Sequence, residues 1–256
     1  MLEKRVAAQL QDHLNSNNLF EKFQSGFRSG HSTETALVRV TNDLLMTADA
    51  GSPSLLILLD LTAAFDTVDH GILLHHLHST IGLSDSPLDW FTSYLTGRTE
   101  YVSLGEAESG THNVTCGVPQ GSVLGPTLFT LYMLPLGSII SRHGVSFHCY
   151  ADDTQLYLRI NPTSSVALPP PTLTTCLEEI QAWMKQNFMK LNSSKTEAII
   201  VGTPHQVRSS TITTITFSGQ DITLSSIVTN LGVKMDAHLT FEAHIKQLYK
   251  NSFYHL

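Results

Sequence analysis

Apolar and polar residues follow one another along this chain in patterns that predict both strands and helices. Residues 55–59 are wholly apolar and lie between a Gly-Ser-Pro break and an aspartate, a pattern typical of a strand buried on both faces. Residues 145–150 and 154–158 are two further apolar, β-prone runs, and the short segment between them predicts a tight turn. We therefore expect a strand, a turn and a second strand in the middle of the chain.

Hydrophobic residues spaced three or four apart predict helices in much of the remaining sequence. Helices are expected over residues 1–20, from Ser32 or Thr33 through Leu45, from Asp66 or Thr67 through Leu77, from Ser86 to Gly97, and over 122–140, 173–188 and 240–256. A hairpin of residues 101–104 with 113–116, a strand over 198–202 and short strands within 211–235 complete the pattern. Because strands and helices alternate irregularly, the predicted fold class is α+β, an antiparallel-rich sheet backed by helices.

Composition indicates a folded intracellular protein. The 256 residues are 41% hydrophobic and 14% charged, which excludes a disordered chain. No apolar run reaches the roughly 18 residues that span a bilayer, and no long apolar stretch follows the first charges, so we expect neither a membrane segment nor a secretory signal. Three cysteines without paired spacing favour a reducing compartment. The expected location is therefore nuclear or cytoplasmic, and the chain is not expected to be secreted.

The formal net charge of −7 limits the kind of nucleic-acid contact that this chain can make alone. Phosphate contacts from Lys and Arg supply much of the affinity of nucleic-acid-binding domains, so such domains are usually basic. The acidic balance argues against a self-sufficient nucleic-acid binder. It permits an enzyme whose acidic residues hold a metal and whose basic parts lie elsewhere.

Two adjacent carboxylates, Asp152 and Asp153, occupy the predicted turn between the two β-prone runs. Adjacent negative charges repel each other, so a cation is expected to neutralise them, and Mg²⁺ prefers carboxylate oxygens. Asp60 ends the apolar run 55–59. If that strand lies beside the hairpin, three carboxylates converge on a site for two Mg²⁺ ions roughly 3.5–4 Å apart. The alternative is that these acids are ordinary turn and capping residues in water.

Several motifs in a fixed order resemble those of a known family. Residues 60–66 (DLTAAFD), 117–126 (GVPQGSVLGP) and 150–153 (YADD) resemble three palm motifs of reverse transcriptases. Residues 24–28 (QSGFR) upstream and 191–197 (LNSSKTE) downstream resemble the wording of the LINE class of non-LTR retrotransposons. The resemblance covers nearly the whole chain, and ordered motifs at family spacing are more specific than any one of them.

The resemblance implies a catalytic role for four residues. Asp60, Asp152 and Asp153 match the triad that binds two Mg²⁺ ions, with Mn²⁺ as a possible substitute. Lys195 matches the position proposed to protonate the pyrophosphate leaving group, although a lone loop lysine is otherwise a solvated surface charge.

Four more residues match positions that contact substrate in the family. Phe65 matches the bulky residue that lies under the incoming sugar and excludes a 2′-hydroxyl, and by pattern alone it would be an ordinary core aromatic. Gln120 and Gly121 match the loop that lies against the nascent base pair. Arg28 matches a position that contacts template or shapes the fingers, and it could equally be a surface arginine.

The family's organisation implies a right-hand polymerase fold with partial fingers over residues 1–53, the palm over 54–203, and primer-grip-like strands with the start of a thumb over 204–256. The thumb is expected to be largely absent, and an Arg-Pro-Ile segment that precedes residues 2–5 in relatives is not seen here. The implied partners are an RNA template, a DNA primer and a dNTP, and the oligomeric state is left open. We expect weak or no polymerase activity from the chain alone.

Two other functions compete with an RNA-directed DNA polymerase domain. A non-catalytic remnant could survive as a nucleic-acid-binding or interaction module. Loss of the catalytic acids would favour this alternative, and all three acids are present; loss of the flanking domains would also favour it, and those domains are not seen here. An RNA-templated RNA polymerase has a similar palm, but it needs a smaller or polar residue at position 65 in order to accept ribose.

Overall fold

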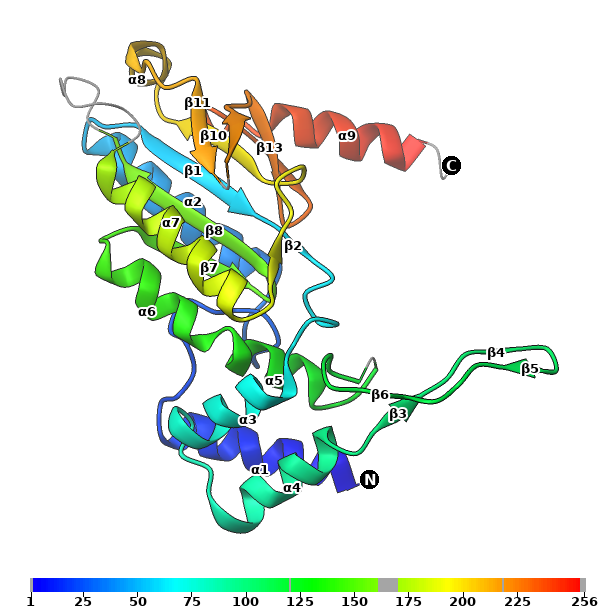
Figure 1. Cartoon of the computed structure of the whole chain (residues 1–256). Coiled ribbons are helices and arrows are strands. Elements are labelled where there is room, and N and C mark those ends of the chain that lie inside the picture. The colour runs from blue at the N-terminus through cyan, green and yellow to red at the C-terminus, as the bar shows by residue number, and fades with distance from the viewer. Residues whose placement is uncertain (1, 120, 161–169, 218, 254–256) are drawn as a thin grey trace. The chain divides into compact units, whose positions relative to one another are not determined.

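The computed structural model describes residues 2–119, 121–160, 170–217 and 219–253 (Figure 1). The chain forms two compact units, each built from separate stretches of sequence. The helical unit comprises Met1–Lys22, Ala63–Pro135 and Met184–Lys190, and the sheet unit comprises Phe23–Thr62, Leu136–Trp183 and Leu191–Leu256. The three expected domains were continuous stretches of sequence, whereas each of the two units is assembled from several stretches. The assignment of residues to fingers, palm and thumb stays a prediction.

A four-stranded antiparallel sheet organises the sheet unit. Its order is β10 (Glu197–Val201), β1 (Ser54–Leu59), β8 (Asp153–Arg159) and β7 (Ser146–Tyr150). In the central strand β1, Ile57 pairs with Ala198 on one side and with Leu156 on the other. The predicted buried strand, the strand–turn–strand around the acidic pair and the strand near residue 200 are all confirmed.

Helices cover both faces of this sheet, which explains why β1 is apolar on both sides. Figure 1 shows α7 (Pro171–Gln186) in front of the strands and α2 (Thr33–Asp49) behind them. Helix α2 begins at the predicted cap Ser32, whose side chain accepts a hydrogen bond from the backbone N–H of Thr35. One core cluster joins α2, the sheet and a neighbouring hairpin; its buried members are Val40, Leu44, Leu56, Tyr157, Ile199, Val201, Val228 and Met235.

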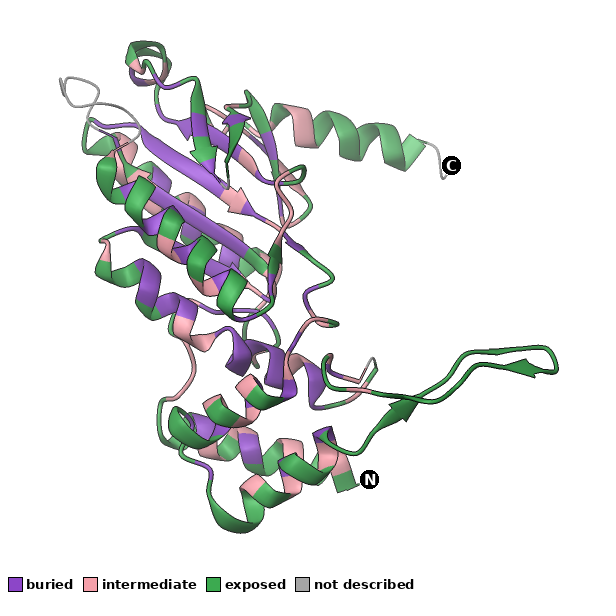
Figure 2. Ribbon diagram, in the orientation of Figure 1, coloured by how far each residue is buried: buried purple, intermediate pink, exposed green. Residues whose placement is uncertain are grey.

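Shorter elements complete the sheet unit. Two hairpins pair β11 (Thr214–Phe217) with β12 (Gln220–Thr223) and β13 (Ile227–Asn230) with β14 (Val233–Asp236), as expected for residues 211–235. The remaining elements are β2 (Leu61–Thr62), β9 (Lys190–Leu191), α6 (Leu134–Arg142), α8 (Pro204–Ser209) and α9 (Glu242–Phe253). None of the residues of α9 is buried (Figure 2).

The helical unit contains α1 (Leu2–Ser16), α3 (His70–Ser79), α4 (Asp85–Leu95) and α5 (Gly125–Tyr132). Helix α5 is buried along its whole described length apart from Pro126. A β-arm extends from this unit and is exposed to solvent (Figure 2); it consists of β3 (Thr99–Glu100), β4 (Ser103–Leu104), β5 (Ala107–Glu108) and β6 (His112–Asn113). In the part of the chain that the structure describes, no helix is both long and apolar enough to cross a membrane.

Two predicted helix starts in the helical unit were wrong by two or three residues. Helix α3 follows Asp69 instead of Asp66 or Thr67, because the Asp69 carboxylate accepts a hydrogen bond of 2.9 Å from the backbone N–H of Ile72. Helix α4 follows Ser84 instead of Ser86. The first-turn N–H groups of a helix have no intrahelical partner, so Pro87 fits anywhere in that turn and did not fix the start.

Two further expectations about local structure were also corrected. The single helix predicted over 122–140 is interrupted at Met133, because Pro135 has no N–H to donate and its ring crowds the preceding turn. The predicted hairpin exists, but Ser103 pairs with Glu108 and not within 113–116. Its turn falls at Gly105, whose φ of 63° suits a tight two-residue connection.

The core of the sheet unit yields a test of the fold. Leu56 is fully buried at the centre of the cluster, so we expect Leu56→Ala to lower the free energy of unfolding by about 2–5 kcal/mol. Leu45→Ala on α2 is the control, because Leu45 is 47% exposed and its truncation should cost under about 1 kcal/mol. Urea denaturation measures both. Equal losses for the two variants would contradict the assigned core.

Candidate active site

The sheet brings Asp60 beside the acidic turn. Leu59 of β1 pairs with Thr154 of the antiparallel strand β8. Asp60, which follows Leu59, therefore lies at the same end of the sheet as Asp153, which precedes Thr154 and follows the turn. The loop after β9 fixes Asp60 from another side, since the Asp60 carbonyl accepts a hydrogen bond of 2.9 Å from the backbone N–H of Asn192. Two segments more than ninety positions apart in sequence thus supply carboxylates to one place.

A pocket of about 310 Å³ opens where these strands end. Four charged residues line it: Asp60, Asp153, Lys195 and Glu197. Leu58, Leu59, Ser194 and Thr229 complete the lining. The Lys195 ammonium nitrogen lies 3.8 Å from Asp60 Oδ2, but 67% of the lysine side chain is exposed. Such a pair contributes little to stability, so it leaves Lys195 available for a ligand.

One carboxylate oxygen of Asp60 lacks a hydrogen-bond partner. This atom, Oδ1, is buried, and no described residue donates a hydrogen bond to it. A buried carboxylate oxygen without a partner is costly, whereas a divalent cation would satisfy it. Within the described ranges, no three His, Cys, Asp or Glu side chains are already arranged so that they could hold a metal ion. The aspartates are therefore neighbours of the right chemistry, and an ion would have to draw them together.

Burial and neighbouring carboxylates raise the pKa values of Asp152 and Asp153. Partial burial, followed by the negative charges of Asp152 and Asp60, raises the pKa of Asp153 to about 6. Partial burial and the charge of Asp60 also raise the pKa of Asp152. Each group therefore holds a proton more tightly than in water. A divalent cation in the pocket would oppose both effects because it attracts the ionised forms.

The structure adds Glu197 to the residues predicted for this pocket. It begins β10 and pairs with Leu58, two residues before Asp60, and its carboxylate accepts a hydrogen bond of 3.0 Å from the backbone N–H of Thr229. The sequence pattern gave Glu197 no role, because its place beside Asp60 depends on the pairing of β10 with β1. Knowing that strand order is what would have identified it.

Two of the other predicted residues lie together in the helical unit. Phe65 and Gly121 line a pocket of about 390 Å³. The Phe65 ring stacks on Phe129 with ring centres 4.3 Å apart and an angle of 21° between the planes. Gly121 has a φ of 76°, a conformation that favours glycine. Gln120, the third residue predicted for this surface, lies outside the described residues.

Arg28 belongs to the loop that precedes α2 in the sheet unit. Its guanidinium Nη1 donates a hydrogen bond of 3.1 Å to the carbonyl of Gln24. This contact within the loop supports the loop's own shape. A role toward template stays a prediction.

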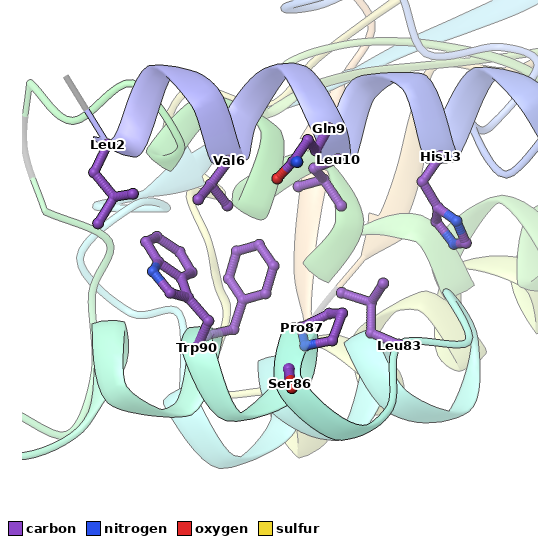
Figure 3. A pocket seen from close by; sticks show the side chains of 10 residues that line it. Leu2, Val6, Gln9, Leu10, His13, Leu83, Ser86, Pro87 and Trp90 are labelled. Atoms are coloured by element: carbon purple, nitrogen blue, oxygen red, sulfur yellow. The ribbon is translucent and has the colours of Figure 1, made fainter.

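Another pocket lies in the helical unit between α1 and α4 (Figure 3). It has a volume of about 550 Å³ and a mostly apolar lining, formed by Leu2, Val6, Gln9, Leu10, His13, Leu83, Ser86, Pro87, Trp90 and Phe91. Asp60 and Asp153, two of the three predicted catalytic aspartates, line the smaller pocket in the sheet unit instead. Volume alone therefore does not mark the chemistry of this protein.

Comparison with known families agrees with these motifs. The profile of the family described as reverse transcriptase (RNA-dependent DNA polymerase) matches residues 1–235. The chain belongs to the reverse transcriptase family. This confirms the resemblance that the ordered motifs indicated.

Relatives come from mobile genetic elements. The chain is 28% identical over 253 residues to a probable RNA-directed DNA polymerase from transposon X-element of Drosophila melanogaster, covering 97% of this chain and 26% of the relative. It is also 28% identical to the RNA-directed DNA polymerase from mobile element jockey of the same species, covering 89% of this chain and 24% of the relative. The chain thus spans about a quarter of the length of these relatives, which confirm the predicted LINE-type resemblance.

Solved structures of telomerase share the fold. The apo telomerase of Candida tropicalis superposes with a TM-score of 0.60 at 14% identity, covering 86% of this chain and 39% of the telomerase chain. A telomerase of Candida albicans in complex with a fragment of telomeric RNA gives a TM-score of 0.57 at 12% identity, covering 91% and 38%. At this identity the likeness shows the fold alone, and it agrees with the predicted mixture of helices and sheet.

The carboxylate cluster generates a pH-dependent prediction for the metal-free protein. A raised folded-state pKa of Asp153 means that its contribution to stability is present below about pH 4 and is lost as the pH rises through about 6. Asn at this position cannot ionise, so Asp153→Asn removes this loss. We expect the free energy of unfolding of the variant to exceed that of the parent by up to about 1 kcal/mol at pH 7 and to equal it at pH 4; the figure is small because water still reaches the side chain of Asp153 and screens its charge.

Urea unfolding in the presence of a chelator, at both pH values, measures that difference. Asp89→Asn is the control, since Asp89 is exposed on α4 in the helical unit. If Asp153→Asn is no more stable than the parent at pH 7, then burial and the neighbouring carboxylates do not penalise the ionised form of Asp153.

Proposed function

We propose that this chain is the polymerase domain of a LINE-type reverse transcriptase, which extends a DNA primer on an RNA template with dNTPs. The observation that supports this most directly is the juxtaposition of Asp60 with the Asp152–Asp153 turn, in a chain of the reverse transcriptase family. Residues 54–203 would serve as the palm, Phe65 and Gly121 would face the nucleotide, and residues 204–256 would brace the primer and begin the thumb.

Asp60, Asp152 and Asp153 would hold two Mg²⁺ ions, or Mn²⁺ in their place. The chemistry of the residues fits: the ligands are carboxylates, they are mutually repulsive, and one Asp60 oxygen is buried without a partner. Bound ions would supply a more acidic primer hydroxyl and would offset the charge that develops on the phosphate oxygens. The residues' own contribution is to place those charges at the end of a rigid, buried sheet.

The reaction joins the primer 3′-oxygen to the α-phosphorus of the dNTP and breaks the bond between that phosphorus and the bridging oxygen. The hydroxyl proton leaves with solvent, and pyrophosphate departs with the electron pair of the broken bond. Lys195 lies at the rim of the same pocket as Asp60 and could deliver a proton to that leaving group. The bulk of Phe65 would exclude a 2′-hydroxyl, and Gln120, Gly121 and Arg28 would align template and nucleotide.

Loss of one aspartate should strongly lower the rate of primer extension. The 256-residue chain carries 15 Lys and Arg against 22 Asp and Glu, so we expect it to hold nucleic acid weakly and to extend a primer only slowly, at low salt and with Mn²⁺. Asp152→Asn should lower that rate by about 100-fold or more, because it removes a ligand needed in the transition state. Asp89→Asn is again the control.

Extension on an RNA template, measured with labelled primer, decides between the alternatives. Equal rates for Asp152→Asn and the parent would refute the assigned triad. Tight RNA binding with no extension by the parent under any condition would favour the non-catalytic module instead. Fast extension by the isolated parent would show that the predicted weakness is wrong.

Sugar discrimination tests the role of Phe65. Phe65→Val shortens the side chain that would lie under the ribose, so rNTP incorporation relative to dNTP should rise by about 100-fold. Phe65→Tyr keeps the bulk and should keep the parent's preference. The ratio of kcat/KM for the two nucleotides is the measurement, and an unchanged ratio in Phe65→Val would eliminate the gate assignment.

A further inference from the structure

The segment before α2 docks on the strand that leads into the acidic turn. The backbone N–H of Cys149 donates to the Phe23 carbonyl, and the backbone N–H of Ser25 donates to the Cys149 carbonyl, each over 2.8 Å. Gln24 and Cys149 form a parallel bridge. This segment therefore adds a short parallel edge to β7, immediately before the turn that carries Asp152 and Asp153.

The side chain of Gln24 satisfies both backbone groups of the turn residue Ala151. Its Oε1 atom accepts hydrogen bonds from the N–H of Ala151, at 3.0 Å, and from the N–H of Gly26, at 2.7 Å. Its Nε2 atom donates to the Ala151 carbonyl at 3.1 Å. Gln24 is only 5% exposed, so water cannot easily replace these bonds.

Ala151 needs such support because its backbone is strained. Its φ is 57°, in the left-handed region that residues with a Cβ rarely adopt. A strained conformation persists only where its surroundings fix it. The side-chain amide of Gln24 forms hydrogen bonds with the peptide groups on both sides of Ala151. These bonds stabilise the backbone conformation of Ala151, the residue directly before Asp152.

Gly26 shows how closely the segment approaches the turn. A Cβ atom on Gly26 would lie 2.1 Å from the Ala151 nitrogen, a separation that atoms cannot adopt. Gly26 does not have a positive φ, so close approach and not backbone conformation requires glycine here. The loop and the turn are thus fitted to each other at the position that precedes the two acids.

We propose that Gln24 is a positioning residue for the acidic turn: by holding Ala151 in its left-handed conformation, it aims Asp152 and Asp153 at the site shared with Asp60. The proposal rests on the proposed function, because the orientation of the two carboxylates matters only if they bind metal ions together with Asp60. A rotation about the Ala151 backbone would redirect both acids together. Groups that hold a metal ligand without touching the metal commonly tune metal affinity by fixing the orientation of that ligand.

Gln24→Met tests the proposal, because methionine nearly matches glutamine in length and forms none of the three hydrogen bonds. The matched control is Gln206→Met. Gln206 is also a buried glutamine of the sheet unit, and its amide bonds the backbone of Thr203 and Ala48 instead of the acidic turn. Both variants should lose stability, so a purely structural role predicts the same metal binding for both once they are folded.

Two measurements on the purified 256-residue chain distinguish positioning from stability. In metal-free protein, the Ala151 amide should exchange its hydrogen about ten-fold faster in Gln24→Met, because its acceptor is gone, and at the parent rate in Gln206→Met. Mn²⁺ binding, followed by the electron paramagnetic resonance of the free ion, should weaken by about ten-fold in Gln24→Met and stay unchanged in Gln206→Met. Should Gln24→Met fail to fold, Gln24→Asn keeps the polar group but is too short to reach Ala151, and the same two shifts are expected.

The outcomes separate this inference from the proposed function. Parent-like Mn²⁺ affinity in a folded Gln24 variant, an unchanged Ala151 exchange rate, or equal losses in Gln206→Met would each overturn the positioning role and leave the polymerase assignment intact. Mn²⁺ binding by the parent that Asp152→Asn does not weaken would overturn the metal site itself, and the positioning role with it.

Discussion

Repulsion between carboxylates at the end of a buried sheet is the constraint on which the site depends. Asp152 and Asp153 are adjacent at the turn, and Asp60 ends the neighbouring strand, so the negative charges of Asp152 and Asp60 act on Asp153. The fold bears this cost through β1, which pairs on both edges and is covered on both faces. The apolar interior fixes the strands, and the fixed strands prevent the acids from moving apart.

The same rigidity is extended to the turn by contacts far away in sequence. Gln24 reaches Ala151 across 127 positions, and the Asp60 carbonyl is held by Asn192 of the loop after β9. Residues before and after the three acids in sequence therefore constrain them. Phe65 and Gly121 share a second pocket in the helical unit, where the ring of Phe65 is stacked on Phe129. Predicted site residues thus line two pockets, one in each unit.

Local patterns in the sequence predicted the parts of this structure that local forces determine. The apolar run before Asp60 and the runs on either side of the acidic pair became β1, β7 and β8, because a short apolar segment between turn residues has few alternatives to a buried strand. Helix starts were less certain wherever several capping residues stood close together, as at Asp66, Thr67 and Asp69. Pro135 lies within an apolar stretch whose pattern predicts a single helix, and it divides that helix in two.

Contacts that depend on strand order were beyond the sequence alone. Glu197 lies near Asp60 only because β10 pairs with β1, and the residues around Gln24 do not indicate a partner as distant in sequence as Ala151.

We propose above all that Asp60, Asp152 and Asp153 hold divalent ions in common. An experimental structure with Mn²⁺ tests it most directly: we expect anomalous scattering peaks bonded to carboxylate oxygens of Asp60 and of the turn, whereas peaks elsewhere, with Asp60 turned away, would contradict it.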